Sequence, residues 1–185
     1  MARYEIVVDG TDTAGKTPTI GALALQFQGK YHLAVYSPFK LQEVFPIWST
    51  QPQRAASVIT GIMAAFRRED PALDLIIWDR GWPTAWVSTE DAVARAMFLP
   101  FPTLTVLLLN TVKTTQEKVK KYNLTGEWLT NPELLLKFNS AYHDLGSEIG
   151  ARLVRFHADA GGRFDIPLVC QKIEEAFAPT LREIR

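Results

Sequence analysis

The most constraining feature of this sequence is a short segment near its N-terminus, Gly10-Thr11-Asp12-Thr13-Ala14-Gly15-Lys16-Thr17. It satisfies the pattern G-x-x-x-x-G-K-[ST] at every fixed position. An apolar run, 4–8, comes just before it, and a helix-like segment, 20–25, comes just after it. This strand–loop–helix setting is the context that the pattern requires, so we predict a phosphate-binding loop (P-loop) at the end of the first strand.

Each residue type in this loop has a physical reason. Gly10 and Gly15 allow backbone angles and close approaches that a side chain would block, so that consecutive N–H groups can point at phosphate oxygens. We expect Lys16 to neutralise charge on the β- and γ-phosphates of ATP and to act in catalysis, and the Thr17 hydroxyl to ligate Mg²⁺. The residues expected to bind the nucleotide are Gly10, Thr13, Ala14, Gly15, Lys16 and Thr17.

Short apolar runs alternate with longer amphipathic segments in the rest of the chain, which is typical of α/β proteins with a parallel sheet. The runs expected to form strands buried on both faces are 4–8, 32–36, 75–78, 104–109 and 153–156. Helices are expected at about 15–28, 53–69, 88–99, 114–122, 131–151 and 165–177. We therefore predict one α/β domain over residues 1–185, a three-layer P-loop NTPase fold whose five-stranded parallel sheet is flanked by helices.

Two of the expected helices begin at recognisable capping residues. Ser88, with Asp91 three residues later, resembles the N-terminal cap of the helix that ends before Pro100. Asn131 followed by Pro132 combines a capping side chain with a proline in the first helical turn.

Composition excludes several classes of protein. The chain has 185 residues, 47% of them apolar, and a formal net charge of zero, which is typical of a globular protein and gives no sign of a dedicated nucleic-acid surface. Its one cysteine, Cys170, cannot form an intrachain disulfide, and we find neither a signal peptide nor an apolar run of membrane-spanning length. We expect a cytoplasmic protein without a membrane partner and leave its oligomeric state, a homodimer included, open.

Three segments carry a resemblance to a known family. Asp9 with the P-loop resembles the loop of thymidylate kinases and related nucleoside and nucleotide kinases, and the run 75–80 is similar to that family's strand ending in Asp-Arg, here Asp79-Arg80. The stretch 106–143 resembles its fourth strand, basic lid region and following helix. The resemblance spans most of the chain and implies an ATP- and Mg²⁺-dependent phosphotransferase with a lid at about 113–131. It also implies that the loop 158–162 lies beside the adenine.

The departures from the family's pattern concern the acceptor more than the nucleotide. Thr13 stands where the family has a second glycine, and Asn110 where it usually has Asp. The segment 37–40, Ser-Pro-Phe-Lys, lacks the Arg-Glu-Pro of thymidylate kinases, and 81–86 lacks the segment that lines their thymine pocket. The phosphoryl-transfer machinery therefore carries over, whereas the identity of the acceptor does not.

Asp79 and Arg80 follow a buried strand at the sheet edge where loops carry chemistry in such folds. The Asp79 carboxylate could hold Mg²⁺ through water or accept the proton of an attacking hydroxyl, and the Arg80 guanidinium could bind an acceptor phosphate. The alternative is a surface ion pair at a strand end. By resemblance Asp12 would bond a sugar hydroxyl of the acceptor, or else stabilise the turn, and Asp9 is the other candidate base.

The remaining candidates each have a plain structural alternative. Arg54 could contact the acceptor phosphate, and Trp82 and Trp86 could stack on a base or belong to the core. The basic stretch Lys118, Lys120 and Lys121 could close over the phosphates as part of a lid, or could be a solvated helix face.

These observations leave three candidate functions. The first is a (deoxy)nucleoside monophosphate kinase resembling thymidylate kinase, with ATP, Mg²⁺ and a small nucleotide acceptor as its partners. The second is a kinase of an unphosphorylated nucleoside or modified nucleoside. The third, a non-catalytic nucleotide-binding module or GTP-dependent switch, is disfavoured because the Asn-Lys-x-Asp and Asp-x-x-Gly segments of a switch do not occur where they would be needed.

Overall fold

A computed structural model describes residues 3–40, 45–48, 50–100, 102–125, 127–146 and 152–182. Its centre is a five-stranded parallel sheet with the strand order β2-β3-β1-β4-β5. The strands are β1 (Tyr4–Gly10), β2 (Leu33–Tyr36), β3 (Leu75–Asp79), β4 (Leu104–Leu109) and β5 (Leu153–His157). The prediction of a parallel sheet built from these apolar runs is confirmed, with boundaries shifted by one or two residues.

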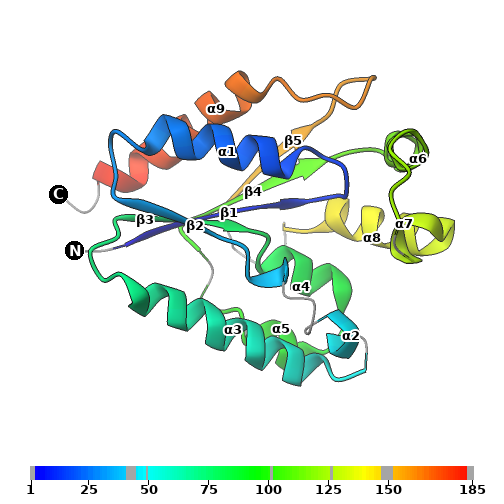
Figure 1. Ribbon diagram of the computed structural model, residues 1–185, viewed down its shortest axis with the longest axis horizontal. Helices are drawn as coiled ribbons and strands as arrows, with labels where there is room; N and C mark the ends of the chain where they lie inside the picture. The colour runs from blue at the N-terminus through cyan, green and yellow to red at the C-terminus, as the bar shows by residue number, and fades with distance from the viewer. Residues whose placement is uncertain are drawn as a thin grey trace.

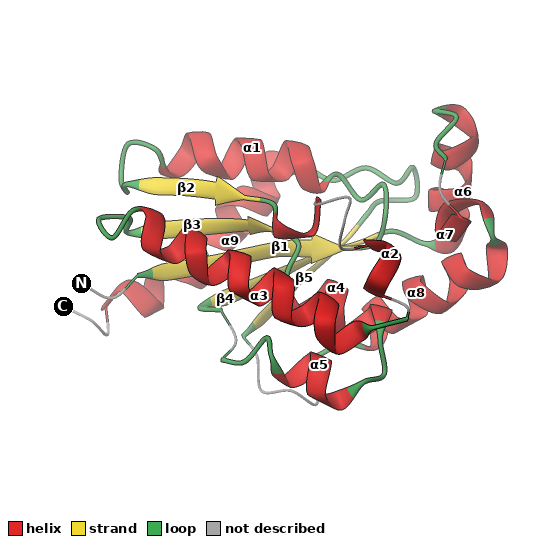
Figure 2. Cartoon of the chain, turned by 60° about the horizontal axis from the view of Figure 1, so that its bottom comes forward, coloured by secondary structure: helices red, strands yellow, loops and turns green. Residues whose placement is uncertain are grey.

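Helices cover both faces of the sheet and give it three layers (Figure 1). On one face lie α1 (Lys16–Phe27) and α9 (Ile166–Arg182). On the other lie α3 (Pro52–Glu69), α4 (Trp82–Ser88) and α5 (Ala92–Ala96), seen from their side in Figure 2. The short elements η1 (Pro38–Lys40) and α2 (Phe45–Trp48) connect β2 to α3.

Alternation along the strands produces two separate cores. Ile6 and Val8 of β1 pack with Leu23 of α1 and Ile173 of α9, whereas Val7 packs with Ile59 of α3 on the opposite side. This pattern follows from the two-residue period of a strand, which sends successive side chains to opposite faces. The central strands β3 and β4 are buried on both faces, whereas the edge strands β2 and β5 are only partly buried, and β5 carries the exposed Arg155 and His157.

The segment that follows β4 extends beyond the carboxyl edge of the sheet. It contains α6 (Val112–Lys121), α7 (Glu127–Thr130) and α8 (Pro132–Asp144), and in Figure 1 it stands at the end toward which the strand arrows point. Asn131 caps α8 as expected, since its side chain accepts hydrogen bonds from the N–H groups of Glu133 and Leu134. The expected continuation of this helix is wrong at Leu145 and Gly146, because α8 ends at Asp144, and residues 147–151 lie outside the described part of the chain.

The prediction of a helix over 88–99 is confirmed only for α5 (Ala92–Ala96), and its expected start at Ser88 is wrong. Ser88 is the last residue of α4, where its hydroxyl donates to the carbonyl of Thr84 (2.6 Å). Asp91 caps the next helix instead, since its side chain accepts from the N–H of Ala94 at 2.8 Å. The earlier helix was missed because Gly81 stands at its cap position and offers no capping side chain. In the part of the chain that the structure describes, no helix is both long and apolar enough to cross a membrane.

Candidate active site

The P-loop runs from the end of β1 to the start of α1. Gly10 has φ of 130°, and a Cβ built there would lie 2.0 Å from the carbonyl oxygen of Leu108 on β4. The neighbouring Thr11 N–H donates to that same oxygen at 3.0 Å. Only glycine can occupy position 10, because the loop leaves the sheet in direct contact with the backbone of the adjacent strand.

Thr13 adopts the left-handed conformation that the family's glycine would supply. Its φ is 60°, a value that is uncommon for a residue with a β-branched side chain. Two neighbours hold this turn: the buried Asn110 donates from Nδ2 to the Thr13 hydroxyl (3.3 Å), and Lys118 donates from Nζ to the Thr13 carbonyl (3.0 Å). Contacts from Asn110, just after β4, and from Lys118 of the helix that follows therefore hold Thr13 in a conformation that glycine would adopt more easily.

Lys16 occupies the first position of α1 and folds back over the loop. Its Nζ donates to the carbonyl oxygens of Gly10 (3.0 Å) and Thr11 (2.7 Å). Burial, and after it the nearby charge of Arg80, lower the pKa of Lys16 from 10.5 to about 8, although the carboxylates of Asp12 and two other aspartates act in the opposite direction. An anionic ligand in the loop would offset both lowering effects, so the site favours phosphate.

Oxygen donors suited to Mg²⁺ stand next to this loop. Thr17 is exposed in the first turn of α1, and Asp79 ends β3, whose register with β1 pairs Asp79 with Val8 directly before the P-loop. No group of three or more His, Cys, Asp or Glu side chains that could hold a metal occurs among the described residues. A hydroxyl and a carboxylate together fit the usual mode of Mg²⁺ binding, in which one or two protein ligands act with substrate phosphates and water.

Asp79 has partners of its own on the far side from the P-loop. Its carboxylate, with a side chain 6% exposed, accepts from Lys40 Nζ at 2.6 Å and from the Ser37 hydroxyl at 3.2 Å. Lys40 and Ser37 come from the chain just after β2, which is the neighbour of β3. Lys40 was not among the residues singled out from the sequence.

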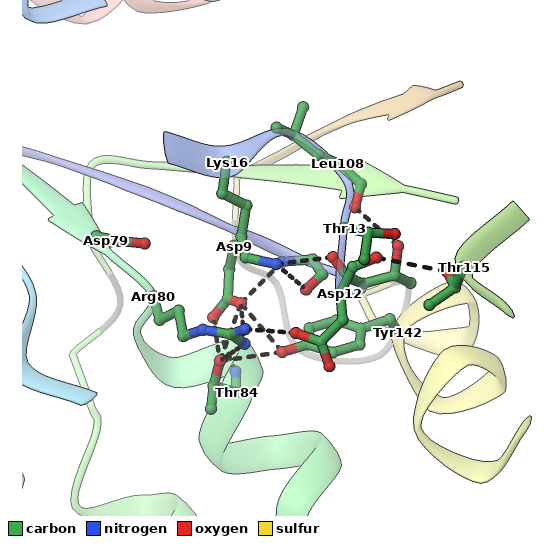
Figure 3. Close-up of polar contacts among 12 residues, drawn as sticks. Asp9, Asp12, Thr13, Lys16, Asp79, Arg80, Thr84, Leu108, Thr115 and Tyr142 are labelled. Carbon is green, nitrogen blue, oxygen red and sulfur yellow. Dashed lines mark hydrogen bonds and ion pairs between the residues drawn. The ribbon is translucent and has the colours of Figure 1, made fainter. Parts of the chain in front are cut away.

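Arg80 faces the P-loop from the end of β3. Its backbone has φ of 69° and its N–H donates to the carbonyl of Val8, so the chain turns sharply after Asp79. The guanidinium donates to Asp12 Oδ1 at 2.7 Å and to the Thr84 hydroxyl at 3.4 Å (Figure 3). The structure thus brings together Arg80 and Asp12, two residues predicted for the acceptor side.

Asp9 lies at the centre of a buried polar network that sequence reasoning did not predict. It is fully buried, and its carboxylate accepts hydrogen bonds from the N–H groups of Gly10, Gly81 and Thr84 and from the hydroxyls of Thr84 and Tyr142, all between 2.8 and 3.0 Å. Figure 3 shows the side chains of Asp9, Thr84 and Tyr142 pointing toward one another. With its oxygens occupied by protein donors, Asp9 ties β1 to the start of α4 and to α8.

Tyr142 and Thr84 are the members of this network that the sequence analysis missed. Tyr142 donates to Asp9 and lies 3.0 Å from the Thr84 hydroxyl, and burial together with the charge of Asp9 raises its pKa well above 10, so it remains a neutral donor. Tyr142 falls within the segment 138–143 that resembles the family, but no local pattern indicates that it reaches a residue 133 positions earlier.

The two tryptophans differ in burial. Trp82 is 2% exposed and its Nε1 donates to the Thr105 hydroxyl at 2.8 Å, so it belongs to the core, one of its two expected roles. Trp86 is half-buried, packs edge-on against Trp82 and lies under the Arg95 guanidinium. Arg54 is exposed near the start of α3 and donates to Gln51 (3.1 Å).

The three lysines of the expected lid have different surroundings. Lys118 is half-buried and bridges two loops, donating to the carbonyl of Thr13 and to that of Gly162 at 2.5 Å, and burial lowers its pKa. Lys120 and Lys121 are exposed, and the Lys121 ammonium lies over the Tyr122 ring. Only Lys118 therefore contacts the P-loop in this structure.

A cavity of about 400 Å³ opens beside the P-loop, which is within the size range of small-molecule binding pockets. It lies between α6 and the segment after β5, and its lining includes Gly15, Lys118, Tyr122, Gly162 and Phe164. The expected adenine-side loop, 158–162, forms part of this wall through Gly161 and Gly162. Gly162 has φ of 70°, and a Cβ there would lie 2.0 Å from Thr114 Cγ2, so the loop closes tightly on α6.

Comparison with known proteins adds information on the fold. No protein-family model and no curated protein matches the sequence. Among solved structures, deoxyadenosine kinase from M. mycoides, with dCMP and dCDP bound, superposes with a TM-score of 0.63 at 15% identity, over 95% of this chain and 99% of that one. The same enzyme with bound dATP gives a TM-score of 0.60 at 16% identity, over 92% and 97% of the two chains.

Thymidylate kinase from Candida albicans gives a similar result, with a TM-score of 0.63 at 14% identity, over 96% of this chain and 92% of that one. One neighbour is thus named for a nucleoside and the other for a nucleotide. The expected α/β fold with its five-stranded parallel sheet is confirmed, and the chain shares the fold of these P-loop kinases along almost its whole length.

Proposed function

We propose that this protein is an ATP- and Mg²⁺-dependent phosphotransferase that phosphorylates a (deoxy)nucleoside monophosphate. The observation that carries the proposal is the meeting of Lys16, Asp79 and the Arg80–Asp12 pair at the carboxyl ends of β1 and β3. Cations and carboxylates placed next to a P-loop suit the transfer of a charged group between two bound molecules.

In this proposal the P-loop N–H groups and Lys16 hold the β- and γ-phosphates of ATP. Thr17 and Asp79 are the residues that would hold Mg²⁺, which when bound supplies charge neutralisation at the phosphates. An acceptor oxygen forms the new bond to the γ-phosphorus, the bond to the β,γ-bridging oxygen breaks, and ADP leaves with that electron pair. The protein contributes position and charge, because this reaction needs little covalent chemistry from the enzyme.

The cavity beside Gly15 is the proposed place for the adenine. Tyr122 and Phe164 offer aromatic faces, and Lys118 joins this wall to the P-loop. The segment 113–131, with α6 and α7, is the proposed lid, and exposed Lys120 and Lys121 would approach the phosphates only if it moves. We further propose that the chain works as one domain in the cytoplasm, in keeping with its single cysteine.

The acceptor distinguishes the two kinase functions. Arg80 offers a planar guanidinium to an acceptor phosphate, which favours a monophosphate. An unphosphorylated nucleoside remains the second candidate, because the segment 81–86 departs from that of thymidylate kinases and one structural neighbour is a deoxyadenosine kinase. In both cases ATP is the donor and its γ-phosphoryl group is transferred.

The test is ATP consumption measured against a panel of deoxynucleosides, nucleosides and their monophosphates, with product identified by chromatography. We expect Mg²⁺-dependent formation of ADP and a diphosphate from at least one monophosphate. Lys16→Ala should reduce the rate by about 10²–10³-fold or more while the protein stays folded, because it removes a cation aimed at the moving phosphoryl group. Activity within about tenfold of the wild type in folded Lys16→Ala would contradict the enzymatic proposal.

A further inference from the structure

The feature that carries a further inference is the ion pair between Lys40 and Asp79. It joins the chain after β2 to the end of β3, and its atoms lie 2.6 Å apart. Asp79 is one of the two proposed Mg²⁺-holding residues, so a protein cation occupies this carboxylate in the structure. The Ser37 hydroxyl donates to the same oxygen, Oδ2.

The two partners of this pair differ in their freedom to move. The Asp79 side chain is 6% exposed, whereas the Lys40 side chain is 60% exposed. A lysine carries its charge on a flexible four-carbon stem, so the Lys40 ammonium can reach a second anion that comes near. Asp79 remains where β3 ends, and Lys40 is the member that can leave.

The other carboxylates at these strand ends are already engaged. Asp12 pairs with Arg80, and the oxygens of Asp9 are taken by backbone and hydroxyl donors. In the described part of the empty protein, none of these three carboxylates is free to take a proton from a hydroxyl, and an uncharged nucleoside brings no anion that would draw Lys40 away from Asp79. A phosphate monoester is already an anion at neutral pH and needs no general base, whereas a nucleoside hydroxyl does.

We propose that Lys40 covers Asp79 in the empty protein and moves to the acceptor's phosphate when a nucleoside monophosphate binds. This inference rests on the proposed function and predicts that the acceptor already carries a phosphate. The exchange uncovers Asp79 only when an acceptor is present, so ATP is protected from attack by water in its absence. In that hydrolysis a water oxygen would take the acceptor's place, giving ADP and phosphate and releasing a proton to solvent.

The first test measures binding without ATP and with EDTA, so that neither metal nor turnover contributes. Nucleoside monophosphates and the matching nucleosides are titrated into the wild type, Lys40→Met and Lys40→Arg by calorimetry. Lys40→Met should weaken monophosphate binding by about tenfold or more, the loss expected for one charge-assisted contact. Nucleoside binding should change less than about twofold, and Lys40→Arg should retain most of the monophosphate affinity.

A matched control is available in Lys30→Met. Lys30 also has one carboxylate partner, Glu174, and its side chain is 52% exposed, but it follows α1 at the opposite end of the sheet. It should behave as the wild type in every titration. Equal monophosphate affinities for Lys40→Met and Lys30→Met would overturn the inference, and thermal unfolding of each variant shows that the comparison is made on folded protein.

The second test is ATP hydrolysis in the absence of any acceptor. Lys40→Met should hydrolyse ATP several-fold faster than the wild type and Lys30→Met, because Asp79 is no longer covered. An unchanged or lower rate would overturn the covering role.

These outcomes also separate the inference from the proposed function. If the wild type transfers phosphate to no acceptor in the panel, the proposed function fails. If it phosphorylates nucleosides but no monophosphate, the kinase activity stands and the inference is overturned. If it phosphorylates a monophosphate and Lys40→Met behaves as Lys30→Met, only the inference fails.

Discussion

Replacing Asp9 with Asn tests the buried network beneath the P-loop. The substitution keeps the size of the side chain but converts one carboxylate oxygen into an NH₂ group that faces other donors. Replacement of Oδ1 leaves the Gly10 N–H and the Tyr142 hydroxyl without their acceptor, and replacement of Oδ2 does the same to the N–H groups of Gly81 and Thr84. Either orientation therefore disrupts at least two buried hydrogen bonds.

The expected loss of stability follows from these contacts. A buried donor left without its acceptor costs about 1–3 kcal/mol, so two such donors give a loss of about 2–6 kcal/mol in the free energy of unfolding. For a domain of this size, each kcal/mol shifts the melting temperature by about 2–4 °C, which gives a decrease of roughly 4–24 °C. Circular dichroism during thermal unfolding measures this decrease directly.

Asp144→Asn is the matched control, because Asp144 is an exposed residue at the end of α8. A melting temperature for Asp9→Asn within about 2 °C of the control would refute the argument that Asp9 anchors these elements. If the fold were equally stable and phosphate transfer fell by about 10²-fold or more, Asp9 would instead be acting in the chemistry, as one of the sequence-based hypotheses allowed.

Three further predictions concern the phosphate-binding groups. The pKa of Lys16 is about 8 in the empty protein, and bound phosphates raise it, so ATP binding at about pH 8.5 should take up a proton and weaken as pH rises further. Calorimetry in buffers of different ionisation enthalpy measures this proton uptake. An equal proton uptake by Lys16→Met would contradict the prediction. Thr17→Ala should raise the Mg²⁺ concentration needed for half-maximal ATP turnover, and an unchanged titration would count against Thr17 as a ligand. Arg80→Lys should raise the acceptor KM and lower kcat with little change in the ATP KM, whereas an unaltered acceptor KM would remove Arg80 from acceptor binding.

The parts of the fold that were predictable are those whose signal is local. The P-loop motif fixes its own flanking strand and helix, and the apolar runs marked every strand because both faces of the sheet are covered. Asn131 identified the start of α8 because a capping side chain acts on N–H groups two and three residues away. By the same logic Asp91 was recognisable as part of a helix start, although the cap itself was assigned to Ser88.

The contacts that could not be predicted join residues far apart in the sequence. Asp9 meets Tyr142 across 133 positions, and Lys40 meets Asp79 only because β2 lies beside β3. Trp82 comes two residues after Arg80, which left stacking on a base and burial in the core equally open. The turn at Gly81 and the Thr105 hydroxyl on β4 decide in favour of the core.

The three aspartates of the site differ in how completely the protein occupies them, and this difference separates scaffold from chemistry. Asp9 accepts its hydrogen bonds from uncharged donors that are buried with it and lies 3.9 Å from the Arg80 guanidinium, and removing those donors would leave buried groups unpaired, so it is fixed. Asp12 and Asp79 are each held by a cation, Arg80 or Lys40, that a phosphate can attract instead. A bound anion can therefore release these two carboxylates but not the first, which is why we place metal and substrate contacts at Asp79 and Asp12 and the mechanical anchor at Asp9.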